Sequence, residues 1–93
     1  MSIKITVVHL SGGIDHEHIT GLRWTNPADG KTGDSSRATL VAWIEDKNGK
    51  AYTEDSSGHR ADVAVVNPAR GEKYLRTRAD GVWTNNLLAL PRY

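Results

Sequence analysis

Residues 74–84 read YLRTRADGVWT and contain the clearest turn signal in the chain. The dipeptide Asp80-Gly81 favours a type I′ turn, because both central residues of that turn need a positive φ. The turn predicts a β-hairpin in which Arg78 lies opposite Trp83. Side chains alternate along a strand. One face of the sheet is therefore expected to carry Tyr74, Arg76, Arg78 and Trp83.

Other strands are expected upstream of this hairpin. The alternation and β-branched residues typical of strands occur at residues 3–10, 18–24, 51–54 and 61–66. In the first strand, the side chains expected to share the inner face are Ile3, Ile5 and Val7. Residues 26–33 contain Pro and Gly and are expected to form an exposed loop.

One helix is expected between the second and third strands. Asp34-Ser35-Ser36 supplies candidate N-caps, and apolar residues from Ala38 to Ile44 follow at helical spacing. Lys47-Asn48-Gly49 is expected to end the helix, because glycine commonly follows the last residue of a helix. The apolar stripe of this helix is expected to pack on the sheet, since a short helix is marginal in water by itself.

These elements predict an α+β fold in a single domain, residues 1–93. We expect a mostly antiparallel sheet of five or six strands with one helix packed on one face, in the order ββαβββ, the sixth strand being residues 82–84. The leucines of residues 86–93 are expected to cap the core. The uncovered face is expected to stay partly apolar around Leu22, Trp24 and the outward pair of residues 63–66, which is either Val63 and Val65 or Ala64 and Val66, and this favours a homodimer.

Composition narrows the classes of function. The 93 residues hold 12 Lys and Arg against 11 Asp and Glu, giving a net charge of +1, without the excess of a protein that coats nucleic acid. The absence of Cys excludes disulfides, thiolate metal sites and cysteine nucleophiles. No apolar run is long enough to span a membrane, and a cytoplasmic location is expected.

The segment Asp15-His16-Glu17-His18 is a candidate metal site. Two histidines at i and i+2 on a strand project from the same face, so His16 and His18 could share a metal, with Asp15, Glu17 or His9 as a further ligand. The alternative is that these residues are polar positions leading from a turn into the second strand. A small metal-binding protein or enzyme is therefore an alternative, and no cofactor is predicted.

The arginine and aromatic side chains of the hairpin are the first candidate for binding. Residues 70–93 hold five Lys and Arg (Arg70, Lys73, Arg76, Arg78, Arg92) and two acidic residues (Glu72, Asp80), a net charge of +3. A guanidinium over an indole can also serve simply as a solvated brace on a sheet. We expect a non-enzymatic binding module that presents Tyr74, Arg76, Arg78 and Trp83 to a protein or an anionic ligand. Nucleic-acid binding through Arg76, Arg78 and Trp83 is a less favoured alternative.

Several segments together show a resemblance to a known family: His16–Thr20, Trp24, Ser36–Ala38, Val41–Ile44, Lys50–Tyr52 and Tyr74–Pro91. They resemble a family of short bacterial proteins, common in actinobacteria, known as domain of unknown function 3892. The resemblance covers nearly the whole chain, and Tyr74–Pro91 is its specific part. Asn85 stands where the family often has an acidic residue. The resemblance implies a free-standing bacterial cytosolic domain and brings no catalytic activity with it.

Overall fold

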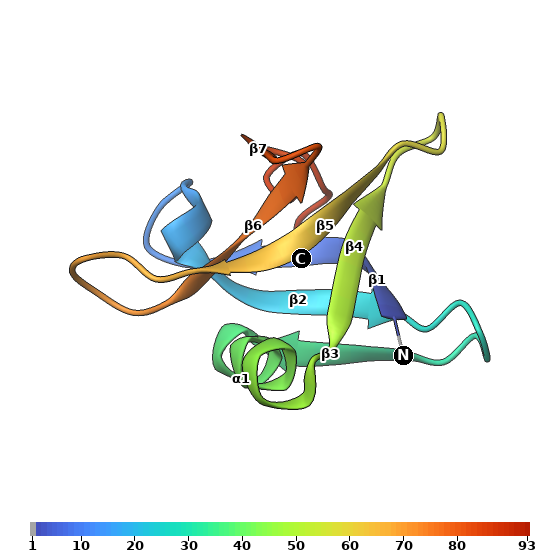
Figure 1. The fold of residues 1–93 in the computed structure, drawn as a ribbon, viewed down its shortest axis with the longest axis horizontal. Coiled ribbons are helices and arrows are strands. Elements are labelled where there is room, and N and C mark those ends of the chain that lie inside the picture. The colour runs from blue at the N-terminus through green and yellow to red at the C-terminus, as the bar shows by residue number, and fades with distance from the viewer. Residues whose placement is uncertain (1) are drawn as a thin grey trace.

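The structure is a computed structural model that describes residues 2–93. Figure 1 shows a twisted sheet with one α-helix and a short 3-10 helix beside it. The elements are β1 (Ser2–Leu10), η1 (His16–His18), β2 (Ile19–Thr25), β3 (Thr32–Ser36), α1 (Arg37–Lys47), β4 (Lys50–Glu54), β5 (Arg60–Val66), β6 (Tyr74–Ala79) and β7 (Val82–Thr84).

All seven strands belong to one sheet, in the order β3-β2-β1-β4-β5-β6-β7. Neighbouring strands are antiparallel except β1 and β4, which run parallel and pair from Ser2–Lys50 to Lys4–Tyr52. The broad α+β class is confirmed. The prediction of five or six strands in the order ββαβββ is wrong, because a third strand precedes the helix and α1 then carries the chain across to β4.

β3 lies where the sequence predicted the end of a loop and the helix caps. Its residues, TGDSS, lack the apolar alternation that marks a half-buried strand. The segment is a strand because its main chain pairs with β2, from Gly21–Ser36 to Thr25–Thr32. As the first strand in the sheet order, β3 is an edge strand and needs no apolar face of its own.

A β-bulge in β1 changes which residues face the core. The register between β1 and β2 shifts between Ile5 and Val7. Ile3 and Ile5 are buried before the shift and Val8 is buried after it, whereas Val7 is only half-buried. The prediction that Val7 continues the inner face is wrong, because one extra residue reverses the alternation of the strand.

The helix α1 forms where it was expected. Ser36 is its N-cap, and the Ser36 Oγ accepts a hydrogen bond of 3.2 Å from the Thr39 N–H. Asn48 ends the helix in the left-handed conformation, with φ 54°. Leu40 and Val41 are buried in the core, and the helix contacts β2, β3, β5 and β6. No helix within residues 2–93 is long and apolar enough to cross a membrane.

After β7 the chain returns to β1. Leu87 is 0% exposed, which confirms that the leucines of this segment complete the core. The Val8 N–H donates to the Pro91 carbonyl at 3.0 Å, and the Tyr93 N–H donates to the Val8 carbonyl at 3.1 Å. One edge of β1 therefore pairs with β2, while its other edge pairs first with β4 and then with the last residues of the chain.

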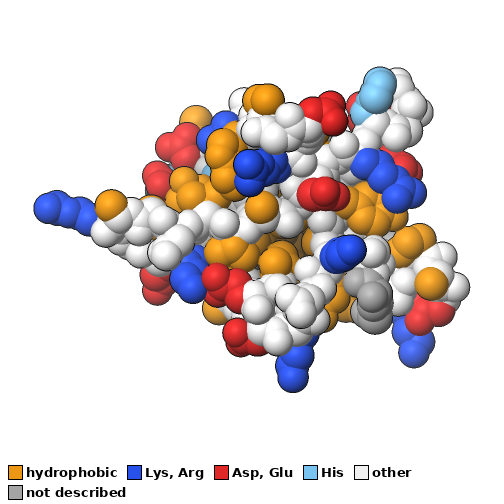
Figure 2. All heavy atoms as spheres, in the orientation of Figure 1, with side chains coloured by type: hydrophobic (Ala, Val, Ile, Leu, Met, Phe, Trp, Pro, Cys, Tyr) orange, Lys and Arg blue, Asp and Glu red, His pale blue; other side chains and the backbone are white. Residues whose placement is uncertain are grey.

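The apolar surface expected on the uncovered face of the sheet is smaller than predicted. Leu22 is 0% exposed and belongs to the core, and Trp24 is half-buried and packs against it. Val63 is buried as well, so the outward side chains of β5 are Ala64 and Val66, both half-buried. Figure 2 shows basic and acidic side chains interspersed over this side of the molecule, with hydrophobic atoms between them.

Candidate functional site

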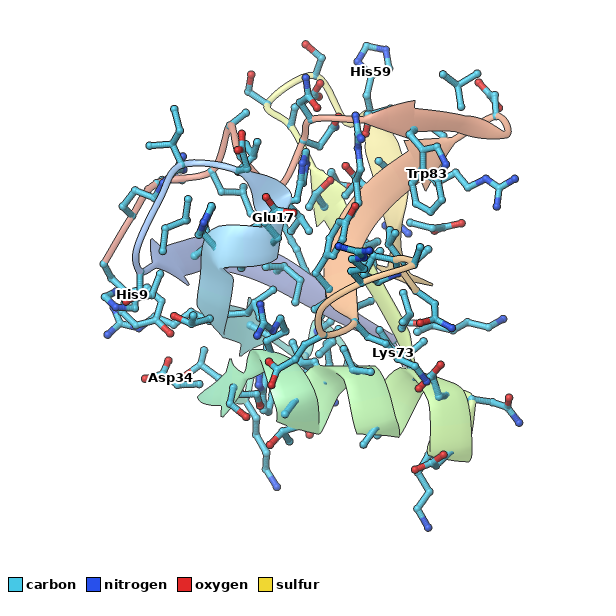
Figure 3. All side chains as sticks on the ribbon, turned by 90° about the vertical axis from the view of Figure 1, so that its left-hand side faces the viewer. His9, Glu17, Asp34, His59, Lys73 and Trp83 are labelled. Carbon is cyan, nitrogen blue, oxygen red and sulfur yellow. The ribbon has the colours of Figure 1, made fainter. Side chains whose placement is uncertain are left out.

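The β6–β7 hairpin has the turn and register predicted from the sequence. Asp80 and Gly81 have φ angles of 52° and 78°, as a type I′ turn requires. Arg78 lies opposite Trp83, and its guanidinium carbon is 5.3 Å from the centre of the Trp83 ring. Trp83, which is 40% exposed, projects from β7 in Figure 3. The predicted cation–π pair is therefore present at the surface.

The outward row that contains Arg78 and Trp83 continues across the sheet. Asp62 of β5 lies opposite Arg78, and Tyr52 of β4 lies opposite Asp62. The neighbours of Tyr52, Asp62 and Arg78 that point inward are buried, namely Ala51, Thr53, Ala61, Val63 and Thr77, so these three side chains lie on the outer face. Tyr52 itself is only 7% exposed there. From β4 to β7 the row therefore consists of an aromatic, an acidic, a basic and an aromatic side chain.

A second cation–π pair lies at the other end of this row. The Arg60 guanidinium carbon is 4.5 Å from the centre of the Tyr52 ring, and Arg60 Nε donates to Glu54 Oε2 at 2.7 Å. Tyr52 and Arg60 were not predicted to belong to a binding surface. We name the combined surface the arginine–aromatic face and define it by five residues: Tyr52, Arg60, Asp62, Arg78 and Trp83.

The ion pair between Arg60 and Glu54 favours the charged form of both groups. The hydrogen bond from Arg60 lowers the pKa of the Glu54 carboxyl and raises the pKa of Arg60 itself. The Arg60 side chain remains 63% exposed. Within residues 2–93, Arg78 forms no salt bridge and is also exposed. Both guanidinium groups are therefore accessible to an anionic group from outside.

Tyr74 and Arg76 lie on the same face of β6 as Arg78, opposite Val66 and Ala64, but both are half-buried. Arg76 Nε donates to the Thr84 carbonyl at 3.2 Å, and Arg76 Nη2 donates to Asn85 Oδ1 at 3.1 Å. Arg76 thus holds the chain where it leaves β7. Tyr74 lines a different hollow, of about 260 Å³, together with Glu17 and Arg37. The four predicted residues share one face of the hairpin, and among them Arg78 and Trp83 are exposed and form the cation–π pair.

A polar hollow of about 480 Å³ lies where β4 ends, beside the arginine–aromatic face. It is lined by Thr53, Glu54, Asp55, Asn85, Asn86, Ala89 and Leu90. Glu54 belongs to this hollow and also binds Arg60. The Thr53 hydroxyl is buried there and has no hydrogen-bond partner. The hollow therefore offers carboxylate and amide groups next to the Arg60–Tyr52 pair.

The predicted histidine pair is not arranged as the sequence suggested. His16–His18 form the 3-10 helix η1, so the prediction that they begin a strand and project from one face is wrong. His16 is 8% exposed, and its Nε2 is buried without a hydrogen-bond partner. Burial, followed by the positive charge of Arg76, lowers the pKa of His16, while Asp15 opposes this effect.

A different set of residues around η1 has the spacing of a metal site. Ligand atoms of Asp15, Glu17 and His18 all lie within 4.8 Å of one another, and His16 is not a member of this group. His18 Nδ1 accepts a hydrogen bond of 3.3 Å from the Asp15 N–H, which leaves Nε2 for an ion. Glu17 is labelled on η1 in Figure 3. Of the two predicted ligands, only His18 lies in this group.

Comparison with known proteins gives one result. A family model described as a protein of unknown function (DUF3892) matches residues 4–91. Searches of curated proteins and of solved structures find no match.

Proposed function

The chain belongs to the DUF3892 family of proteins of unknown function, and from its surface we propose that it is a non-catalytic binding module. The arginine–aromatic face binds an acidic segment of a partner protein. The observation that carries this proposal is the pair of cation–π contacts, Arg60 on Tyr52 and Arg78 on Trp83, with both guanidinium groups exposed. Aromatic residues and arginine are the side chains that contribute most at protein interfaces.

The edge of the sheet supports a peptide partner. β7 is the last strand in the sheet order, so its outer main-chain groups are unpaired within the sheet. Val82 is 65% exposed and Trp83 is 40% exposed on this short strand. An extended peptide can add to such an edge through main-chain hydrogen bonds. Acidic side chains of that peptide would then lie within reach of Arg78.

The charge pattern favours protein over nucleic acid. Asp62 lies in the centre of the face, between Tyr52 and Arg78, and Glu54 borders it. These carboxylates would repel a continuous phosphate backbone, which is recognised mainly by many Lys and Arg together. A peptide that alternates acidic and other residues can avoid both carboxylates. Nucleic-acid binding through Arg76, Arg78 and Trp83 is therefore the less favoured alternative, and the binding experiment below includes an oligonucleotide to test it.

Fluorescence anisotropy with a labelled glutamate-rich peptide tests the proposal. We expect saturable binding that weakens when salt is raised from about 50 to about 200 mM, because exposed charges are screened. The double variant Arg60→Ser plus Arg78→Ser is expected to weaken binding roughly 5- to 30-fold, since each exposed cation–π or ionic contact contributes about 0.5–1 kcal/mol.

A second double variant controls for net charge. Lys47→Ser plus Arg70→Ser also removes two exposed positive charges, from α1 and from the loop before β6, and it should leave the affinity almost unchanged. Equal weakening by both double variants would show that only overall charge matters. Tighter binding of labelled oligo-dT than of the peptide would favour the nucleic-acid alternative and contradict the proposal.

Metal binding is a second candidate function, favoured by the proximity of Asp15, Glu17 and His18. Zinc, nickel or manganese added to metal-free protein should raise the melting temperature, because a ligand that binds the folded state stabilises it. The rise should disappear in Glu17→Gln plus His18→Gln and persist in His59→Gln. An unchanged melting temperature with all three metals would remove this candidate.

We also predict a homodimer, although the apolar surface that would form its interface is smaller than the sequence suggested. Leu22 and Val63 are buried in the core, so Ala64 and Val66 are the apolar side chains of β5 that point outward. Light scattering after size exclusion, at high protein concentration, should give twice the chain mass. A mass of one chain under those conditions would contradict the prediction.

A further inference from the structure

A small apolar cavity, partly open to solvent, lies between α1 and the β1–β3 part of the sheet. Its volume is about 180 Å³, and it is lined by Ile3, Trp24, Ser35, Thr39, Leu40 and Trp43. None of these residues belongs to the arginine–aromatic face or to the group around η1. The cavity is therefore a separate feature with its own chemistry.

Two indole rings form walls of this cavity, and each lies against a glycine. Trp24 is opposite Gly33 in the β2–β3 ladder, and a Cβ added at Gly33 would lie 2.6 Å from Cζ2 of the Trp24 ring. A Cβ added at Gly49 would clash directly with the ring of Trp43. Neither glycine has a positive φ. Glycine is therefore needed at both positions for the space it leaves, which lets the indoles lie flat on the backbone and fixes their orientation.

The polar side-chain groups of Trp24, Ser35 and Thr39 in the lining are hydrogen-bonded within the protein. Trp24 Nε1 donates to Ser35 Oγ at 3.1 Å, and Ser36 Oγ donates to Thr39 Oγ1 at 2.9 Å. Ile3 and Leu40, both 3% exposed, contribute only hydrocarbon. The lining contains no Asp, Glu, Lys or Arg. A charged ligand would lose its hydration here without gaining a partner.

We propose that this cavity binds a small, uncharged aromatic molecule of one ring. An apolar cavity of about 150 Å³ is large enough for benzene, so the size fits one ring. Two indoles in fixed orientation favour an aromatic ligand over an aliphatic one, because ring quadrupoles attract in stacked or edge-to-face geometry. The ligand is held between Trp24 and Trp43, with Leu40 beside it.

Toluene is the probe, and the three indole N–H signals in a ¹H–¹⁵N NMR spectrum are the readout. We expect saturable shifts of the Trp24 and Trp43 signals, with a Kd of roughly 0.1–1 mM for so small a ligand. The Trp83 signal, on the distant β7 strand, is the internal control and should not move. Equal shifts of all three signals, or no saturable shift, would overturn the proposal.

Variants and a second probe test the site and the ligand class. Thr39→Leu should fill the cavity and weaken toluene binding at least tenfold, whereas Thr39→Ser should bind toluene as the wild type does. Should Thr39→Leu fail to fold, Gly49→Ala provides the same test by displacing Trp43. Cyclohexane should bind several-fold more weakly than toluene. Equal affinity for the two would show that the cavity does not select aromatic molecules and would overturn that part of the proposal.

Discussion

His16 is a buried base whose protonation the fold opposes. Its side chain is 8% exposed, its Nε2 has no partner, and burial together with the charge of Arg76 lowers its pKa below the usual 6.5. The unfolded chain therefore takes up a proton at higher pH than the folded chain does. By linkage, the free energy of unfolding is expected to decrease as the pH falls from 6.5 through the lower pKa of the folded state.

Replacing His16 tests this pH dependence. In His16→Gln, the loss of stability between about pH 7.5 and about pH 5, measured by urea unfolding, should be smaller than in the wild type, because one proton-linked group is gone. His59→Gln removes an exposed imidazole instead and is the matched control. A wild-type pH dependence that survives in His16→Gln would show that another group causes it.

The residues of the arginine–aromatic face were only partly predictable. Arg78 and Trp83 could be paired from the sequence, because a two-residue turn at Asp80-Gly81 leaves one register for the hairpin. Arg60 and Tyr52 could not, since residues 55–59 form a longer loop and do not specify the register of β4 against β5. The Arg60–Tyr52 contact could therefore be identified only after the register of β4 against β5 was known.

At the scale of elements, the turn between β6 and β7 is the feature on which the face depends. Gly81 has φ 78°, a conformation that costs about 1–2 kcal/mol for a residue with a Cβ. Gly81→Ala is therefore expected to lower the free energy of unfolding by about 1–2 kcal/mol in urea denaturation. Asp80 has φ 52°, so Asp80→Gly relieves an existing cost and should be neutral or slightly stabilising.

The two turn variants also separate stability from binding. Gly81→Ala should weaken binding of the glutamate-rich peptide, because Arg78 and Trp83 lose their fixed register, while Asp80→Gly should not. If Gly81→Ala were as stable as the wild type, the type I′ turn would not have the energetic role assigned to it.

Elements whose own residues contain a cap or an apolar pattern could be predicted from the sequence. Elements that form only because another strand pairs with them could not. α1 has a cap at Ser36 and an apolar stripe, and it forms as expected. β3 has neither and exists because β2 pairs with it. The bulge in β1 has no sequence signal in residues 3–10, because either Val7 or Val8 could face the core equally well. The spacing of His16 and His18 predicted a strand. The segment instead forms a turn, because the His18 N–H donates to the Asp15 carbonyl.

At the scale of the whole molecule, pairings between distant segments complete the fold. β1 pairs in parallel with β4 across the β3–α1 connection, and the last residues of the chain pair with β1 near Val8. Such contacts depend on where the intervening elements bring the chain, so local patterns do not reveal them. The apolar tail was nevertheless recognisable, because a run of leucines at residues 87–90 is too hydrophobic to remain in solvent.

The tail is expected to be part of the cooperative core. Leu87 is 0% exposed, so Leu87→Ala should lower the free energy of unfolding by about 2–5 kcal/mol, a large share of the stability of a small domain. Leu90→Ala, at a half-buried position in the same segment, should have a smaller effect.

Hydrogen exchange distinguishes a local effect from a global one, because the Val8 N–H donates to the Pro91 carbonyl. In Leu87→Ala the Val8 amide should exchange faster by the same factor as the β5 amides, since one core joins them; faster exchange at Val8 alone would show that the tail opens independently of the sheet.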